Sequence, residues 1–205
     1  IASRIIDDTL VTIPSEIGKP DINSLEINSD HIILMERNTG NILYDKNGNV
    51  KMYPASTTKI LTAILVLENC DFNETAEVTS LALKAVPATY ATCNIQVGEK
   101  FTVKDLLYTT LIKSANDAAN VLAIHISGSI SGFAELMNKK AEELGCTASH
   151  FVNPSGVHDE DHYTTARDLA IIANYAMNLT EFREIVVCST CSLPGTKLHP
   201  SEDRV

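Results

Sequence analysis

The stretch Pro54-Ala55-Ser56-Thr57-Thr58-Lys59 leads directly into the apolar run Ile60-Leu61-Thr62-Ala63-Ile64-Leu65-Val66-Leu67. Apolar side chains fall on nearly every side of a helix drawn through this run, which is typical of a buried helix. We therefore predict a central helix over residues 57–69. Ser56 would lie at its N-terminus, where unpaired N–H groups and the helix dipole favour negative charge on a hydroxyl.

Lys59 stands three residues after Ser56 and would therefore share its helix face. The apolar helix would partly desolvate the ammonium group, and desolvation lowers the pKa of a lysine so that its amine can act as a base. Ser56 and Lys59 therefore form a candidate nucleophile and base. The alternative interpretation is an N-cap serine beside a solvated lysine, since S-x-x-K also occurs by chance.

A second candidate group is Ser114-Ala115-Asn116, which precedes a strongly apolar helix predicted to end at Ile126. Ser114 could relay a proton, and Asn116 could form a hydrogen bond with a substrate amide. Simple capping of the helix by either side chain is the alternative.

The rest of the chain predicts an α+β domain. A β-hairpin is expected from strands at His31–Glu36 and Ile42–Tyr44, joined by a turn and followed by a polar loop at Asp45–Asn49. Further helices are expected over 131–144 and 165–177, and 179–187 is either a short helix or a strand. Residues 1–27 are predicted to be an extended N-terminal segment, and residues 28–205 an incomplete domain, because a hairpin alone does not make a stable sheet.

Composition limits the partners. The chain has 205 residues and a formal net charge of −10, which argues against a nucleic-acid surface because phosphate contacts need clustered Lys and Arg. Hydrophobic residues make up 44% and charged residues 20%, as in soluble globular proteins. No apolar run approaches the roughly 18 residues of a membrane-spanning helix. The first residues lack the pattern of a signal peptide.

Other clusters have simpler interpretations. The five cysteines do not form a disulfide framework, and the single CxxC at Cys188–Cys191 is interpreted as two ordinary thiols on a strand rather than a redox or zinc site. His158 and His162 would suit zinc if they were helical, but Gly156 and the acidic residues between them favour a loop. Glu142 and Glu143 are interpreted as a solvated helix face.

Together, Ser56–Lys59 and Ser114–Asn116 resemble the motifs of the penicillin-recognising serine enzymes, and among them the serine-type D-alanyl-D-alanine carboxypeptidases, or low-molecular-weight penicillin-binding proteins. These carry S-x-x-K, then S-x-N, then K-T-G. Class A β-lactamases usually have Asp where this chain has Ala115, so the resemblance favours the carboxypeptidases. It covers most of the chain, including three further stretches: Met35–Tyr44, Phe151–Gly156 and His162–Ala170.

The resemblance implies a transpeptidase/β-lactamase-like fold and a mechanism. Ser56 would attack the carbonyl between two D-alanines of a peptidoglycan stem peptide, with Lys59 as base and Ser114 as proton relay. Asn116 would bind substrate, and the Ser56 N–H would supply half of an oxyanion hole. β-Lactams would acylate the same serine. No metal or organic cofactor is implied, and the place of action would be the bacterial cell envelope, outside the cytoplasm.

The sequence departs from the family pattern at one point. It contains no Lys-Thr-Gly, and Pro194-Gly195-Thr196-Lys197 has those letters only in reverse. The expectation is therefore a truncated chain that lacks the later sheet strands, the β-rich second domain and the membrane anchor of many relatives, and whose activity is impaired. A β-lactamase-like hydrolase and a catalytically dead penicillin- or peptidoglycan-binding domain remain as alternatives. An exposed sheet edge could also recruit a second copy.

Overall fold

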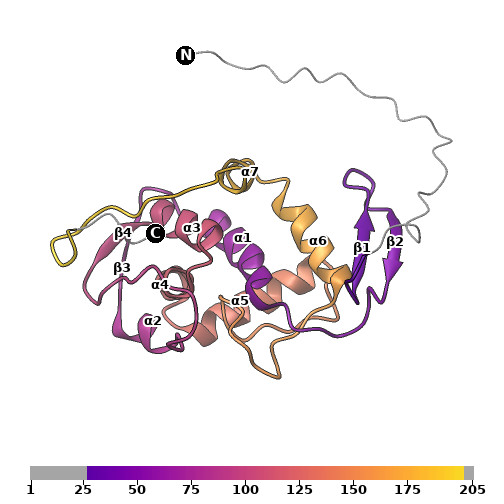
Figure 1. Cartoon of the computed structure of the whole chain (residues 1–205), viewed down its shortest axis with the longest axis horizontal. Helices are drawn as coiled ribbons and strands as arrows, with labels where there is room; N and C mark the ends of the chain where they lie inside the picture. The colour runs from indigo at the N-terminus through magenta and orange to yellow at the C-terminus, as the bar shows by residue number, and fades with distance from the viewer. Residues whose placement is uncertain (1–26, 201–205) are drawn as a thin grey trace, which may run out of the picture.

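The computed structural model of the chain describes residues 27–200 (Figure 1). Along the chain the elements are β1 (Ile32–Met35), β2 (Ile42–Lys46), the 3-10 helix η2 (Ala55–Thr58), α1 (Lys59–Asn69), β3 (Thr75–Glu77), α2 (Ser80–Lys84), β4 (Lys100–Thr102), α3 (Val103–Ile112), α4 (Asn116–Ser127), α5 (Ile130–Glu143), α6 (Ala166–Ala176) and α7 (Thr180–Val186). The predicted α+β class, with an N-terminal hairpin and a helical block, is confirmed.

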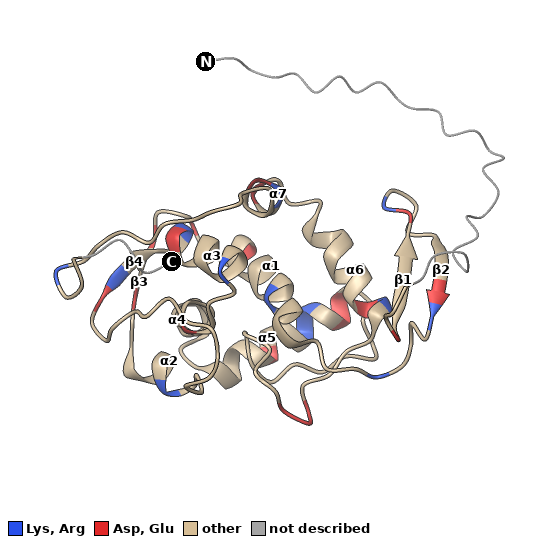
Figure 2. Ribbon diagram, viewed as in Figure 1, with Lys and Arg blue, Asp and Glu red and all other residues tan. Residues whose placement is uncertain are grey.

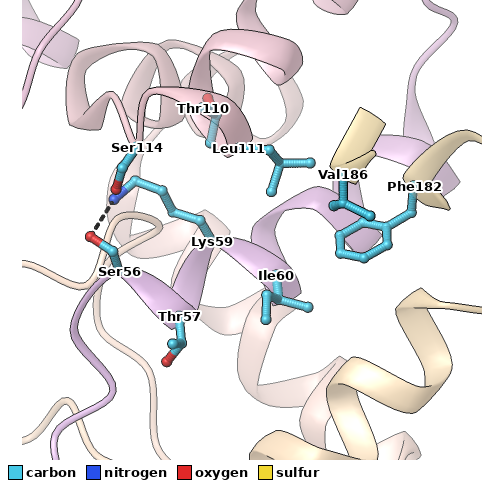
Figure 3. Close-up of a pocket in the computed structure, with 9 residues that line it drawn as sticks. All are labelled: Ser56, Thr57, Lys59, Ile60, Thr110, Leu111, Ser114, Phe182 and Val186. Carbon is cyan, nitrogen blue, oxygen red and sulfur yellow. Dashed lines mark hydrogen bonds between the residues drawn. The ribbon is translucent and has the colours of Figure 1, made fainter. Parts of the chain in front are cut away.

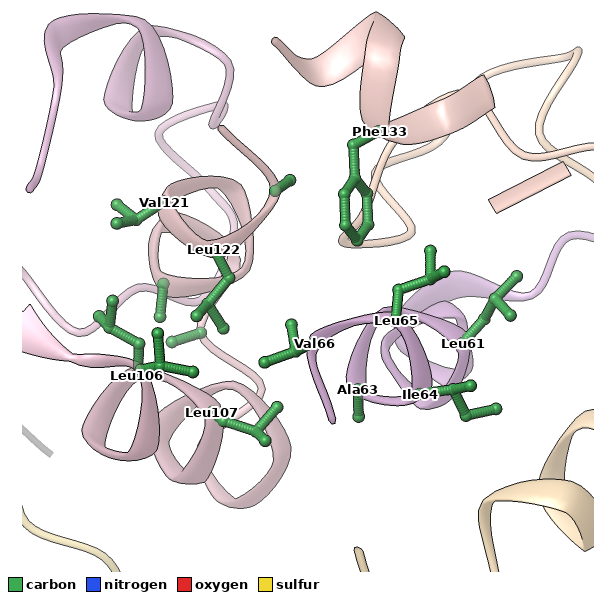
Figure 4. Close-up of a cluster of buried hydrophobic side chains, with 14 of the residues drawn as sticks. Leu61, Ala63, Ile64, Leu65, Val66, Leu106, Leu107, Val121, Leu122 and Phe133 are labelled. Atoms are coloured by element: carbon green, nitrogen blue, oxygen red, sulfur yellow. The ribbon is translucent and has the colours of Figure 1, made fainter. Parts of the chain in front are cut away.

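Helix α1 lies at the centre of the helical block and packs against α3, α4, α5, α6 and α7. Its residues Leu61 to Val66 are all buried, as a helix that is apolar on every side requires. Figure 4 shows how neighbouring helices fill the space around it. Leu106 and Leu107 come from α3, Leu122 from α4 and Phe133 from α5, and each of these side chains is fully buried. The candidate nucleophile therefore lies directly before a helix that is buried on nearly every side.

The described residues form only two-stranded sheets. β1 and β2 pair antiparallel with Ile33 opposite Asp45, and β3 and β4 pair antiparallel with Ala76 opposite Phe101. Outside these sheets the described residues have two isolated bridges, Met52 with Thr164 and His150 with Tyr163, and no further strand follows β4 up to residue 200. The expected scarcity of late strands therefore holds over residues 27–200.

Several predicted boundaries are corrected. The central helix begins as η2, whose first residue Ala55 has a left-handed backbone, and it becomes α-helical only at Lys59. Asp45 and Lys46 belong to β2 rather than to a loop, since they pair with β1. Of the two alternatives for residues 179–187, the helix is correct: α7 spans Thr180–Val186. The structure also adds β3, β4, α2 and α3, which the sequence patterns did not reveal.

The prediction that the two CxxC thiols lie on a strand is wrong. Cys188 and Cys191 follow the end of α7 in irregular backbone and are not on a strand. All five cysteines lie within the described residues, and none of them is part of a disulfide bond there. The extended segment predicted over residues 1–27 lies outside the described residues, apart from Ile27.

Charge is dispersed over the fold. Figure 2 shows Lys and Arg spread over the hairpin, α1, α5 and β4 rather than gathered along one element. Within residues 27–200, no helix combines the length and the apolar content that crossing a bilayer requires.

Candidate active site

Ser56 lies on η2, immediately before α1, and its side chain is exposed. The preceding residue, Ala55, has φ +48°, a left-handed conformation that residues with a side chain adopt rarely. Such strain is maintained only where the surrounding structure enforces it, and it is common at functional sites. The turn thus presents the Ser56 hydroxyl at the start of a helix, as predicted.

Lys59 is 2% exposed, and its Nζ has three oxygen neighbours. It lies 3.2 Å from Ser56 Oγ, 2.9 Å from Asn116 Oδ1 and 2.7 Å from the backbone oxygen of Ser155. Figure 3 shows the Ser56 contact, with the lysine side chain extending from α1 between the two serines. The alternative of a solvated lysine is therefore wrong.

The hydrogen-bond inventory of this nitrogen suits a base. An amide oxygen and a backbone carbonyl can only accept, so Asn116 and Ser155 require two N–H donors from Lys59. A neutral amine has two N–H groups and one lone pair, and the lone pair is then left for the hydroxyl hydrogen of Ser56. Burial lowers the pKa of Lys59 to about 8, so roughly one molecule in ten carries the neutral amine at pH 7.

Asn116 is held by a second set of contacts. Its Nδ2 donates to the backbone oxygen of Ala91 at 2.8 Å, which fixes the amide so that Oδ1 faces Lys59. The N-cap residue of α4 is Ala115, with no side-chain capping bond, and neither Ser114 nor Asn116 caps this helix. Ser114 has φ +56° and lines the same cavity as Ser56 and Lys59. The simple capping interpretation is thus wrong, and the structure brings all four candidate residues together.

The loop over residues 153–156 carries no candidate catalytic side chain, yet its Ser155 carbonyl accepts a hydrogen bond from Lys59. Asn153 Oδ1 accepts hydrogen bonds from the backbone N–H groups of Ser155 and Gly156, which orients the Ser155 carbonyl. Thr62 of α1 donates to the Pro154 oxygen at 2.6 Å and fixes the loop to the helix. The tight Asn-Pro-Ser-Gly turn was the available signal, but a backbone acceptor has no side-chain signature.

Gly156 permits the closest approach between this loop and the nucleophile turn. Its φ is +82°, and a Cβ at this position would overlap the backbone carbonyl of Ala55. Nearby, the buried His162 contacts Thr58 Oγ1 through Nε2 at 2.8 Å, while its Nδ1 accepts the Val152 N–H at 3.1 Å. This pattern requires a neutral imidazole with its proton on Nε2, and burial lowers the pKa of His162 to about 4.

The cavity in front of Ser56 has a volume of about 370 Å³. One end is polar and contains Ser56, Lys59 and Ser114. The other end is an apolar wall, and it is made by Ile60 of α1, Leu111 of α3 and Phe182 and Val186 of α7 (Figure 3). The site therefore has room for a small substrate beside the hydroxyl.

The other sequence clusters do not form sites in the described residues. His162 is engaged with Thr58 and Val152, while His158 stacks edge-on against Tyr53, so the histidines do not converge on a common point. Glu142 and Glu143 are exposed, as expected for a solvated helix face.

An exposed hydroxyl beside a buried amine at the start of the central helix suits an enzyme that transfers acyl groups through its own serine. Comparison with known proteins is consistent with that class. The family model described as D-alanyl-D-alanine carboxypeptidase (Peptidase_S11) matches residues 17–193. The chain belongs to this family.

Individual relatives have similar descriptions. The chain is 37% identical over 179 residues to the D-alanyl-D-alanine carboxypeptidase DacF of Bacillus subtilis, covering 84% of this chain and 46% of that protein. A crystal structure of a D-alanyl-D-alanine carboxypeptidase from Mycobacterium tuberculosis superposes with a TM-score of 0.77 at 30% identity, covering 84% of this chain and 64% of that one.

A mutant of the Streptomyces K15 DD-transpeptidase superposes with a TM-score of 0.79 at 30% identity, covering 86% of this chain and 72% of that one. These solved structures confirm the transpeptidase-like fold. The chain spans about half the length of the curated relatives it matches, 46% of the Bacillus protein and 60% of a mycobacterial one.

Proposed function

We propose that the protein is a serine D-alanyl-D-alanine carboxypeptidase, which removes the terminal D-alanine of a peptidoglycan stem peptide through an acyl-enzyme on Ser56. The observation that carries this proposal is the environment of Lys59 Nζ. Two obligate acceptors occupy its donors, and the Ser56 hydroxyl lies 3.2 Å away. Membership of the carboxypeptidase family supplies the substrate class.

Acylation begins with a proton transfer. As Ser56 Oγ attacks the carbonyl carbon of the penultimate D-alanine, Lys59 accepts the hydroxyl proton through its lone pair. The carbonyl oxygen becomes an oxyanion. The Ser56 N–H stabilises it, since N–H groups in the first turn of a helix lack intrahelical acceptors.

Collapse of this intermediate breaks the C–N bond and releases D-alanine. The leaving nitrogen needs a proton, and Ser114, which lines the cavity with Lys59, relays the one that Lys59 received. Water then attacks the ester, with Lys59 again as base, and regenerates the Ser56 hydroxyl. The steps use the side chains named here, the Ser56 N–H, the substrate and one water molecule.

Asn116 has two roles in this proposal. Its Oδ1 holds Lys59 in place, and its Nδ2 donates one hydrogen to Ala91. The second Nδ2 hydrogen is available for the acyl chain of the substrate.

β-Lactams acylate the same serine in this account, because their strained amide resembles the D-Ala-D-Ala terminus. The partners are therefore peptidoglycan stem peptides and β-lactams. The place of action is the bacterial cell envelope outside the cytoplasm.

Release of D-alanine from a tripeptide ending in D-Ala-D-Ala tests the proposal. We expect the Ser56→Ala variant to abolish release, while Ser80→Ala, which alters an exposed serine of α2, leaves it unchanged. Measurable release that is equal in the Ser56→Ala variant and in the unsubstituted chain would overturn the proposal. Fast turnover of a β-lactam without D-alanine release would assign a β-lactamase-like hydrolase instead.

A further inference from the structure

A second cluster of reactive side chains lies at the opposite end of α1 from Ser56. Cys70 is the C-cap residue of α1, Glu74 directly precedes β3, and His125 is in the last turn of α4. One ligand atom from each of these residues lies within 4.8 Å of the other two. α4 contacts both α1 and β3, so the cluster joins three elements that are separate in the sequence (Figure 1).

The side chains of the cluster are oriented. His125 Nε2 lies 3.1 Å from Glu74 Oε2, and the other oxygen of Glu74 accepts the Asp71 N–H at 2.6 Å. The side chains of His125 and Glu74 are 25% and 44% exposed, so a solute can reach them. Cys70 is half-buried and free.

The surroundings of Cys70 are open and acidic. A cavity of about 310 Å³ adjoins it, and two of the residues lining that cavity are Asp71 and Glu181. Among residues 27–200, no Lys or Arg lines this cavity. The local charge therefore favours a cation, in a chain whose net charge is −10.

We propose that Cys70, Glu74 and His125 bind a thiophilic divalent cation of the zinc type, with water as the fourth ligand. A thiolate, an imidazole and a carboxylate together are a donor set that zinc prefers. Zinc–ligand bonds of about 2.0–2.3 Å put tetrahedral ligand atoms roughly 3.3–3.7 Å apart. Small side-chain rotations would bring the cluster to that spacing.

Binding must displace a proton. The pKa of the Cys70 thiol is raised to about 11 by burial and by the neighbouring Glu74 carboxylate, so the metal-free thiol is protonated at neutral pH. Formation of the metal–sulfur bond releases that proton to solvent.

The site would stabilise the fold rather than take part in the acyl-transfer reaction. The eleven residues of α1 separate Cys70 from the nucleophile turn, a helix length of about 16 Å at ~1.5 Å per residue. A cation there would connect the end of α1 to β3 and α4. Because only the folded chain brings the three ligands together, binding should raise the unfolding temperature. The proposal therefore does not depend on the proposed peptidase activity.

Cobalt and zinc titrations test the site. The starting protein carries Cys188→Ser and Cys191→Ser, which removes the CxxC thiols as competing ligands. We expect Co²⁺ to produce a thiolate-to-cobalt charge-transfer band at one equivalent, and Zn²⁺ to abolish that band and raise the unfolding temperature. In the same background, Cys70→Ser should remove the band.

Variants of the other two ligands separate metal binding from loss of folding. His125→Gln and Glu74→Gln retain the thiol, and each should lower zinc affinity by at least the 10–100-fold typical of losing an outer-shell contact. His31→Gln, a histidine of the hairpin region, is the matched control and should leave zinc affinity unchanged. Circular dichroism checks that each variant is folded.

The proposal is overturned if the starting protein shows no charge-transfer band, or if a folded Cys70→Ser variant retains it. It is also overturned if His125→Gln and Glu74→Gln bind zinc as tightly as the starting protein. In those cases Glu74 and His125 are simply a hydrogen-bonded pair that connects the residue before β3 to α4.

Discussion

At the scale of single residues, the chemistry depends on one nitrogen. Lys59 Nζ has three oxygen neighbours, and two of them, from Asn116 and Ser155, can only accept hydrogen bonds. Those acceptors also stabilise a charged ammonium, but burial acts in the opposite direction and lowers the pKa to about 8. The lysine is thus close to the protonation balance that a general base requires.

The acylation rate should therefore depend on pH with a known sign. Only the neutral amine can take the Ser56 proton, so the second-order rate constant for acylation by benzylpenicillin should rise with pH through about 8 and then level off. Lys59→Arg, which stays charged, should lower that constant by about 10²–10⁴-fold. A profile that is flat between pH 6 and pH 10 would contradict Lys59 as base.

A second residue-scale prediction concerns His162. Burial lowers its folded-state pKa to about 4, below the ordinary value of 6.5. Between these values the unfolded chain binds more protons than the folded chain. The contribution of His162 to the free energy of unfolding is therefore complete above pH 6.5 and is lost as the pH drops toward 4. The loss should be on the order of 3 kcal/mol. Urea unfolding measures it; His162→Gln should flatten this pH dependence, and His31→Gln should not.

At the scale of elements, the nucleophile turn depends on the loop that crosses it. Gly156 and Gly145 both have φ +82°, but a Cβ at Gly145 would meet nothing, whereas one at Gly156 would overlap the Ala55 carbonyl. Gly145→Ala should cost only the left-handed strain of about 1–2 kcal/mol and leave acylation unchanged. Gly156→Ala should cost more stability and also slow acylation, because the turn that carries Ser56 must move. Equal effects in the two variants would show that the contact does not matter.

The packing of α5 on α1 allows a further prediction. Phe133 is fully buried between these helices and α4, with no polar function (Figure 4). Phe133→Ala should lower the free energy of unfolding by about 3–5 kcal/mol, measured by urea denaturation. Ser131→Ala, at an exposed position two residues earlier in the same helix, should change it by less than about 0.5 kcal/mol. A small loss for Phe133→Ala would mean that α5 is not part of the core.

The elements differ in how well the sequence predicts them. The buried α1 and the amphipathic α5 have periodic apolar residues, and their existence was predicted within a few residues. β3 and β4 have only three residues each, too few for an alternating pattern to be visible. α3 was missed although Thr102 caps it, through a hydrogen bond from the Asp105 N–H.

In the candidate site, too, some residues could be predicted from the sequence and others could not. Ser56, Lys59, Ser114 and Asn116 carry distinctive side chains at distinctive spacings, so their grouping was predictable. Ser155 contributes a backbone carbonyl. The position of this carbonyl depends on a turn and on a hydrogen bond from Thr62 of α1, which is far away in the sequence. The left-handed backbone of Ala55 and Ser114 is likewise set by tertiary contacts and leaves no trace in composition.

At the scale of the whole molecule, the hairpin is attached to the helical block mainly through α6. Arg167 of α6 pairs with Asp45 of β2 at 2.5 Å, and α6 contacts β1. Leu34 and Leu43 of the hairpin remain about 40% exposed.

In the family this chain resembles, a strand with Lys-Thr-Gly completes the site. We expect a chain extended through such a strand to be acylated at least 10²–10³-fold faster than residues 1–205, as for the loss of an oxyanion donor. Equal rates would show that the strand is dispensable.

Intact-mass spectrometry after incubation with benzylpenicillin tests the central claim, acylation of Ser56, most directly. The chain of residues 1–205, a chain extended through the Lys-Thr-Gly strand, and the Ser56→Ala form of each would be compared, with folding checked by circular dichroism. We predict one covalent adduct on the extended chain, lost in its Ser56→Ala form, with slower or no labelling of residues 1–205. No adduct on either folded wild-type chain, or an adduct that persists without the Ser56 hydroxyl, would contradict the account and leave a non-catalytic binding domain.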